Sequence, residues 1–416
     1  MTQTSSAGRM PEIRVPGMLT LGGLIAGLVA GVLLKGSPVL PPLLDIAGPL
    51  GTFWLKALKM TILPLVAGLM FTGIVETAAA ANAGAMAKRT LGLIVGVLAA
   101  SAILGGVLMP AFLALFPPPA IAMPHAAAAP DAPLPGFGDF LGSLVPSNVF
   151  TAAADDAMLP VIVFIALFAT ATTRLAEEPR RHLALLFEGL TGAMIVVIGW
   201  VLKVAPLGVF ALGLSLAASS GLAAIGALVH YILLVASLGA VFLLGAYPLA
   251  VLAGRKRLGA FTRAVLPAQV VAISTQSSLA SLPAMLASCR RLEVRNTTSE
   301  FVLPLAVTLF RSTGPAMNMG VAIYAAHLAG HTLTPMAIAA GVLVAFVTTF
   351  GTVSLPGTLS FIASTGPIAA AMGVPLWPLG ILVAVEMLPD IMRTVGNVTM
   401  DVAVSSAVDA GVDNEE

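Results

Sequence analysis

Long apolar runs alternate with short polar connections along almost the whole chain. The runs have the length that crosses about 30 Å of hydrocarbon when a helix rises 1.5 Å per residue. The pattern therefore predicts eight membrane-spanning helices, over residues 17–35, 51–79, 89–116, 158–173, 183–217, 223–254, 299–326 and 376–408.

Two further apolar stretches, 260–290 and 338–372, do not behave as straight spans. Small polar residues followed by proline interrupt both, in SSLASLPAM at 277–285 and GTVSLPGTL at 351–359. Basic residues flank the first stretch on both sides, so a single crossing would break the alternation of charged connections. Each stretch is interpreted as a re-entrant hairpin, with a kinked ordinary helix as the alternative. A hairpin followed by a span, occurring twice, predicts an inverted repeat that meets at the membrane midplane.

Basic residues lie in alternate connections, around positions 9–14, 88–89, 174–181 and 255–257, whereas segment 117–157 has four Asp and no Lys or Arg. The positive-inside rule then places both termini in the cytoplasm and segment 117–157 outside. The expected location is the cell inner (plasma) membrane, crossed many times.

Composition agrees with a polytopic membrane protein. Hydrophobic residues make up 58% of the 416 residues and charged residues 9%, far from the quarter that is typical of soluble domains. The net charge of +1 and the absence of a basic cluster argue against a nucleic-acid partner. The single cysteine, Cys289, excludes an internal disulfide and a cysteine-based metal cluster. No cofactor is predicted.

The candidate chemistry lies in the last span. Glu386, Asp390, Arg393, Asn397 and Asp401 are spaced by four, three, four and four residues, which keeps them within about an 80° arc of one helix. Charges at membrane depth cost from about 2.5 to more than 10 kcal/mol each, so they must share a polar or water-filled place. That place is either a solute or ion site or a structural ion-pair network.

Several motifs resemble those of the glutamate transporter family, the dicarboxylate/amino acid:cation symporters. They are KMTILPL (59–65), APLGVFAL (205–212), SSLASLP (277–283), LPG (355–357) and LPDIMRTVGNVTMD (388–401). The resemblance runs over nearly the whole chain. It implies a homotrimer in the lipid bilayer, two hairpins acting as gates, and transport by an elevator motion of the hairpin-bearing domain against a fixed scaffold.

With the predicted spans, the resemblance divides the chain into four parts. Residues 1–16 form a cytoplasmic tail, and 17–254 form six helices that include the trimerisation scaffold. Residues 255–408 form the transport core, with hairpin 1 at 260–290, helix 7 at 299–326, hairpin 2 at 338–372 and helix 8 at 376–408. Residues 409–416 form a second cytoplasmic tail.

The resemblance also implies a substrate site. Arg393 matches the arginine that clamps the substrate's side-chain carboxylate, a role that suits a planar, permanently charged guanidinium. Asp390 matches the acceptor of the α-amino group, which dicarboxylate members lack, so an acidic amino acid is favoured over succinate. The other matching contacts lie near the α-carboxylate and at the two hairpin tips: Thr394, Asn397, Gln276, Ser278, Leu355 and Gly357.

The chain departs from the family where sodium would bind. The Asn-Met-Asp-Gly-Thr motif of sodium-coupled members reads Phe-Arg-Ser-Thr-Gly at 310–314, and Asp401 remains as a remnant sodium ligand, with no metal site predicted. We hypothesise that the Arg311 guanidinium occupies the sodium space beside Asp401; the alternative is that Arg311 points outward.

Because an arginine cannot release its proton, coupling falls to the carboxyl groups of Glu386, Asp390 and Asp401, whose neutral form burial favours. The sequence thus predicts proton-coupled, sodium-independent symport of glutamate or aspartate. The alternatives are a C4-dicarboxylate symporter and a sodium-coupled acidic amino acid symporter. A passive anion channel lined by arginines is less consistent with hairpin gates. An enzyme is not expected, because Ser277 and Ser278 have no histidine base at matching depth.

Overall fold

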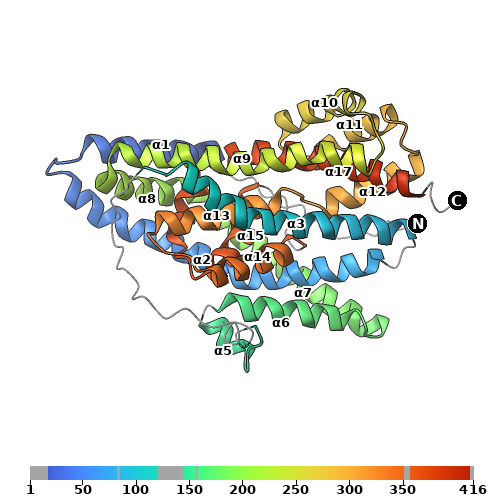
Figure 1. Ribbon diagram of the computed structural model, residues 1–416. Coiled ribbons are helices and arrows are strands. Elements are labelled where there is room, and N and C mark those ends of the chain that lie inside the picture. The colour runs from blue at the N-terminus through green and yellow to red at the C-terminus, as the bar shows by residue number, and fades with distance from the viewer. Residues whose placement is uncertain are drawn as a thin grey trace, which may run out of the picture.

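The fold is a bundle of long helices that lie side by side (Figure 1). The computed structural model describes residues 17–81, 85–119, 142, 144–155, 157–350 and 357–412, and within these ranges the regular structure is entirely helical. This confirms the predicted all-α polytopic membrane protein.

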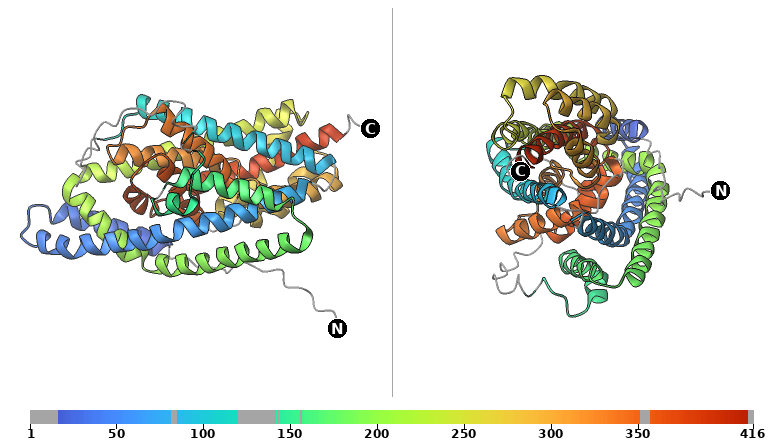
Figure 2. Two further views of the ribbon diagram at one scale, coloured as in Figure 1. Left: turned by 90° about the horizontal axis from the view of Figure 1, so that it is seen from below. Right: turned by 90° about the vertical axis from the view of Figure 1, so that its right-hand side faces the viewer.

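Within the described residues, eight helices precede the first hairpin. In the right-hand view of Figure 2 they enclose much of the bundle. Their bounds are α1 (Gly17–Leu33), α2 (Leu40–Ala81), α3 (Ala85–Leu115), α5 (Val149–Ala154), α6 (Met158–Thr172), α7 (Glu177–Lys203), α8 (Ala205–Ser220) and α9 (Leu222–Leu252). The predicted span 183–217 is thus two helices, α7 and α8. Pro206 in the first turn of α8 explains the division, because its ring would clash with the Leu202 carbonyl in a continuous helix.

The second part of the chain repeats one order of elements. A pair of helices packed on each other is followed by a broken helix, and the order then recurs. The first set is α10 (Leu258–Thr275), α11 (Ser278–Arg291), α12 (Asn296–Leu309) and α13 (Gly314–Leu328); the second is α14 (Pro335–Thr349), α15 (Gly357–Ala371), α16 (Trp377–Leu382) and α17 (Met387–Val412). The two packed pairs are the predicted hairpins.

Both spans that follow the hairpins are broken, whereas the sequence predicts them as continuous over 299–326 and 376–408. The breaks fall at residues 310–313 and 383–386. Pro315 and Pro389 lie in the first turns of α13 and α17, and each would clash with the carbonyl four residues earlier if the helix ran on. Non-helical backbone at membrane depth is tolerated where it lines a site or is buried in protein.

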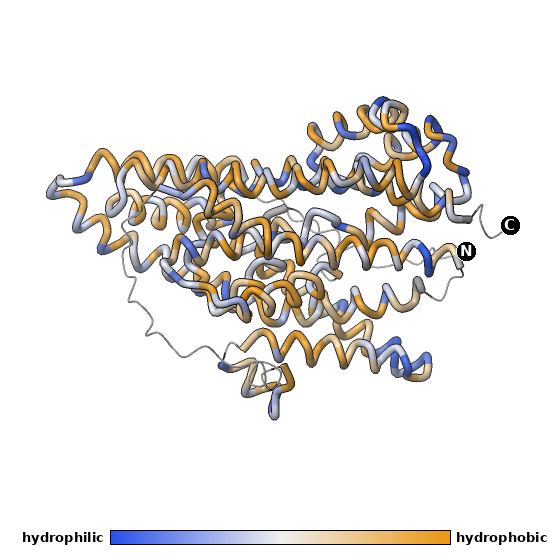
Figure 3. Tube along the Cα trace, in the orientation of Figure 1, coloured by the Kyte–Doolittle hydropathy of each residue, from blue (hydrophilic) through white to orange (hydrophobic). Residues whose placement is uncertain are grey.

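Polarity follows the bundle axis. In Figure 3 hydrophilic residues gather at the ends of the helices, and hydrophobic residues dominate between them. Among the described residues, five helices are both long and apolar enough to cross a membrane: 40–79, 86–115, 177–203, 222–252 and 258–275. Several shorter apolar helices accompany them, including α1, α6 and α8.

The packing of α1 on α8 depends on a row of glycines. A side chain on Gly23 or Gly27 would collide with the backbone carbonyls of Pro206 and Phe210. Small residues four apart allow helices to approach this closely in membranes.

We therefore expect Gly27→Val to destabilise the protein by about 1–3 kcal/mol, the cost of overpacking a tight contact. Thermal unfolding in detergent would measure the change. Gly22→Val is the matched control, because a Cβ at Gly22 meets no atom within 4 Å. Equal melting temperatures for the two variants would contradict the close contact.

The last helix extends beyond the predicted boundary at 408. Helix α17 continues to Val412, and Asp409 is buried, although the sequence places it in a tail. The Arg295 side chain donates to Asp409 Oδ1 at 2.9 Å and Thr298 Oγ1 donates to the same atom at 2.8 Å. These bonds satisfy the buried carboxylate, which accounts for the extra turn.

Candidate functional site

Helix α17 lies inside the bundle, packed against α9, α10 and α12. This position turns its polar face toward other helices, so the predicted charged side chains lie away from the surface. Glu386, Arg393, Asn397 and Asp401 are all less than 6% exposed.

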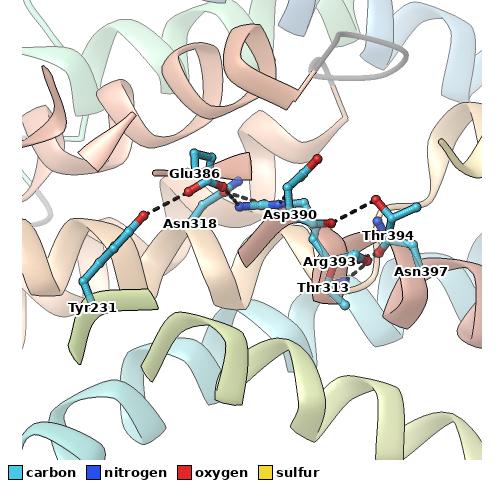
Figure 4. A network of polar contacts seen from close by, with 8 residues as sticks. All are labelled: Tyr231, Thr313, Asn318, Glu386, Asp390, Arg393, Thr394 and Asn397. Atoms are coloured by element: carbon cyan, nitrogen blue, oxygen red, sulfur yellow. Dashed lines mark hydrogen bonds and ion pairs between the residues drawn. The ribbon is translucent and has the colours of Figure 1, made fainter. Parts of the chain in front are cut away.

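Arg393 is the centre of a buried polar network (Figure 4). Its Nη2 donates to Glu386 Oε1 at 2.6 Å and its Nη1 donates to Asn318 Oδ1 at 2.8 Å. Its Nε lies 3.0 Å from Asp390 Oδ1. Tyr231 Oη on α9 donates to Glu386 Oε2 at 2.9 Å. The guanidinium is therefore held on three sides by groups from α13, α17 and the break before α17.

A second set of bonds fixes the break between α12 and α13 to α17. Asn397 Oδ1 accepts from the Thr313 backbone N–H at 3.0 Å, and the Thr313 and Ser312 hydroxyls lie 2.9 and 3.2 Å from it. Thr313 Oγ1 also lies 3.1 Å from the Arg393 carbonyl. Thr394 Oγ1 donates to the Asp390 carbonyl at 3.0 Å, within its own helix.

Asp401 differs from the other acids. It is fully buried, and neither carboxylate oxygen has a hydrogen-bond partner among the described residues. The positive charge of Arg311 acts on it electrostatically, but no ion pair within 4.0 Å joins the two in the described part of the chain. The charge of Asp390 also acts on Arg311. It therefore lies among the acids without forming the close pair that the sequence suggests.

The hairpin tips are placed only in part. Gln276 ends α10 in the left-handed conformation, at φ 49° and ψ 33°, and Ser278 begins α11 after Ser277 has capped it. No hydrogen bond joins Gln276 or Ser278 to the Arg393 network in the described ranges. Leu355 lies outside the described residues, and Gly357 is the first residue of α15.

Four residues of these two sets of contacts were not selected from the sequence as site residues: Tyr231, Ser312, Thr313 and Asn318. Tyr231 lies in an apolar run, where its hydroxyl gives no periodic signal. A useful signal is that a buried tyrosine hydroxyl usually needs a partner. Thr313 lies in the segment 310–314 that departs from the family's sodium motif, and Asn318 lies four residues after it, but their contacts depend on the break in the helix.

The network is suited to binding a small anion with an amino group. A guanidinium offers two parallel donors to a carboxylate, and Asp390 beside it can accept an ammonium group. Two arginines, Arg311 and Arg393, lie among three acids, Glu386, Asp390 and Asp401, so the site holds several charges of both signs. In a buried place such charges must be balanced by a ligand, a cation or a proton.

The chain is similar in sequence to known symport and transport proteins. A sequence profile of the Sodium:dicarboxylate symporter family matches residues 17–410. The Proton/sodium-glutamate symport protein of Bacillus subtilis (strain 168) is 28% identical over 388 residues, 91% of this chain and 88% of the relative. The Proton/glutamate-aspartate symporter of Escherichia coli (strain K12) is 26% identical, covering 85% and 82%. C4-dicarboxylate transport protein 3 of Ralstonia nicotianae is 27% identical, covering 94% and 88%.

The profile covers nearly the whole chain, including both hairpins, both broken helices and the buried arginine network. The chain, a multi-pass membrane protein, therefore belongs to the sodium:dicarboxylate symporter family of transporters.

Proposed function

We propose that this protein is an elevator-type symporter that carries glutamate or aspartate together with protons and does not require sodium. The observation that carries the proposal is the buried Arg393 guanidinium, held between the carboxylates of Glu386 and Asp390. Two of the relatives described above carry glutamate in their names, which supports the same substrate class.

Asp390 determines which class of substrate binds. Its carboxylate lies 3.0 Å from Arg393 Nε, so a carboxylate on the guanidinium and an ammonium on Asp390 would fit one small zwitterion. A dicarboxylate such as succinate would bring a second anion to Asp390 and be repelled. Thr394, Asn397 and the hairpin residues Gln276, Ser278, Leu355 and Gly357 are proposed to complete the site.

Glu386 links the substrate to a proton. Its carboxylate occupies the Nη2 edge of Arg393, where the side-chain carboxylate of a substrate would bind. Protonation of Glu386 would weaken this ion pair and free the edge for the substrate. Glu386, Asp390 and Asp401 are the proposed proton carriers.

Arg311 supports independence from sodium. It lies in the break between α12 and α13, and its charge acts on the unpartnered Asp401. A fixed cation there would repel a sodium ion and stabilise the Asp401 carboxylate in its place.

The assembly and its place in the cell are part of the proposal. We infer a homotrimer in the inner membrane with both termini in the cytoplasm, in which the core 255–408 moves against the scaffold formed within 17–254. The support is the resemblance to the family and the alternation of basic connections along the chain.

A C4-dicarboxylate symporter is the second candidate, because relatives with that name align over the same length. Uptake of labelled aspartate into proteoliposomes would test both candidates. We expect accumulation when the outside is acidic, with or without sodium, and weak competition by succinate. Strong competition by succinate would favour the second candidate, and an absolute requirement for sodium would overturn proton coupling.

A further inference from the structure

A crevice separates α2 from the second hairpin and α16. Two adjoining cavities of about 230 and 200 Å³ form it, and both are lined by Lys59, Ile62 and Leu376. Glycine contacts hold the helices together beside it: a Cβ on Gly366 of α15 would lie 3.0 Å from Ile62, and Gly380 of α16 packs directly on Leu55. No residue of the Arg393 network lines either cavity.

The walls of the crevice are mostly apolar, but two lysines also line it. Phe361, Ile362 and Trp377 lie along the hairpin side. Lys56 and Lys59 lie three residues apart on α2, which puts them on one face of the helix, and both are exposed. The crevice thus combines apolar walls with two lysine side chains, and Lys59 lines both cavities.

The depth of the lysines matches that of a lipid headgroup. The 22 residues from Lys59 to Ala81 rise about 33 Å along α2, close to the hydrocarbon thickness of about 30 Å. If the Ala81 end of α2 lies at one surface of the membrane, both lysines lie at the other. The part of the crevice beyond Lys59, at Ile62 and Leu63, would then be level with the acyl chains, and the ammonium groups would be level with the phosphates.

We propose that this crevice is a binding site for an anionic phospholipid. One acyl chain lies along the half-buried side chains of Leu63, Leu376 and Trp377, and the phosphate contacts Lys56 and Lys59. The lipid would lie between the scaffold and the core of the proposed transporter, where it would resist sliding of α15 along α2. The binding itself does not depend on the proposed transport activity.

The three tryptophans allow a direct test. Trp377 lines the crevice, Trp54 is buried with its Nε1 donating to the Val201 carbonyl, and Trp200 is 62% exposed. In a Trp200→Phe background, phospholipids with brominated acyl chains should quench Trp377 when they enter the crevice. A Trp377→Phe variant identifies the quenched residue.

The probes are brominated phosphatidylglycerol and brominated phosphatidylcholine. Each is titrated into unlabelled phosphatidylcholine vesicles that hold the full-length protein. We expect half-maximal quenching of Trp377 at a severalfold lower fraction of brominated phosphatidylglycerol than of brominated phosphatidylcholine. Each of Lys56→Gln and Lys59→Gln should reduce this preference about fivefold at most, the usual effect of one lysine beside an anionic headgroup.

Lys203→Gln is the matched control. Lys203 is exposed and ends α7 close to the Val201–Trp54 bond, at a level similar to that of Lys56, but it does not line the crevice. Equal quenching by the two lipids, or an equal effect of Lys203→Gln, would overturn the proposal. Because the readout is binding, its failure would leave the transport proposal untouched, and a failure of transport would leave the lipid site intact.

Discussion

Uptake by an Arg393→Gln variant is expected to fall by about 30-fold to 4,000-fold, the loss that follows when one partner of a buried, hydrogen-bonded charge pair is removed. Glutamine cannot offer two parallel charged donors to a carboxylate. Arg393→Lys keeps the charge but loses the planar fork, so it should also be strongly impaired. Initial rates of labelled aspartate uptake into proteoliposomes would measure both.

Folding must be separated from binding in this test, because Arg393→Gln leaves Glu386 and Asp390 buried without their cation. The double variant Arg393→Gln with Glu386→Gln removes one of these charges and should restore a monodisperse protein without restoring uptake. Arg263→Gln is the control, since Arg263 is exposed and bonds only to the Gly259 carbonyl of its own helix among the described contacts. A folded Arg393→Gln protein with nearly normal uptake would contradict the assigned site.

Arg311→Met is expected to make uptake respond to sodium. Without the arginine, Asp401 keeps two buried oxygens that have no hydrogen-bond partner in the described structure, and the nearby positive charge is lost. An uncompensated buried carboxylate typically costs 3–5 kcal/mol, so a cation that binds there is strongly favoured. Stimulation of roughly tenfold or more by sodium should appear in the variant and be absent from the parent protein.

Two further variants locate this effect. Arg311→Lys keeps a positive charge and should remain insensitive to sodium. Arg311→Met combined with Asp401→Asn removes the carboxylate and should lose the sodium response. Sodium stimulation that persists in the combined variant would place the ion elsewhere and remove Asp401 from the coupling scheme.

The helices and the charged face were predictable for a simple reason. An apolar run long enough to cross the membrane is stable in lipid as a helix. In a helix, side chains spaced by three and four residues lie on one face, whatever surrounds them. Arg393 and Asn397 therefore lie together on α17 as the sequence implies.

The breaks and their contacts were not predictable in the same way. The segments 310–313 (Phe-Arg-Ser-Thr) and 383–386 (Val-Ala-Val-Glu) lie inside longer apolar runs that predict continuous spans, and Pro315 and Pro389 are the residues that explain the interruptions. Glu386 consequently precedes α17 instead of lying on it, and it reaches Arg393 from the preceding turn. Tyr231 comes from a distant helix, so its bond to Glu386 depends on tertiary packing.

The bonds around Asn397 have a consequence for ion selection. A side-chain amide oxygen has two lone pairs, and that of Asn397 already faces three donors from residues 312–313. Ser101 is engaged in the same manner, because its hydroxyl accepts the Ala316 N–H at 3.1 Å. Oxygens occupied by the chain's own hydrogens make poor ligands for a metal ion. An incoming alkali cation would have to break these bonds at the start of α13 before Asn397 or Ser101 could coordinate it, so a cation that binds near Asp401 must take its other ligands elsewhere.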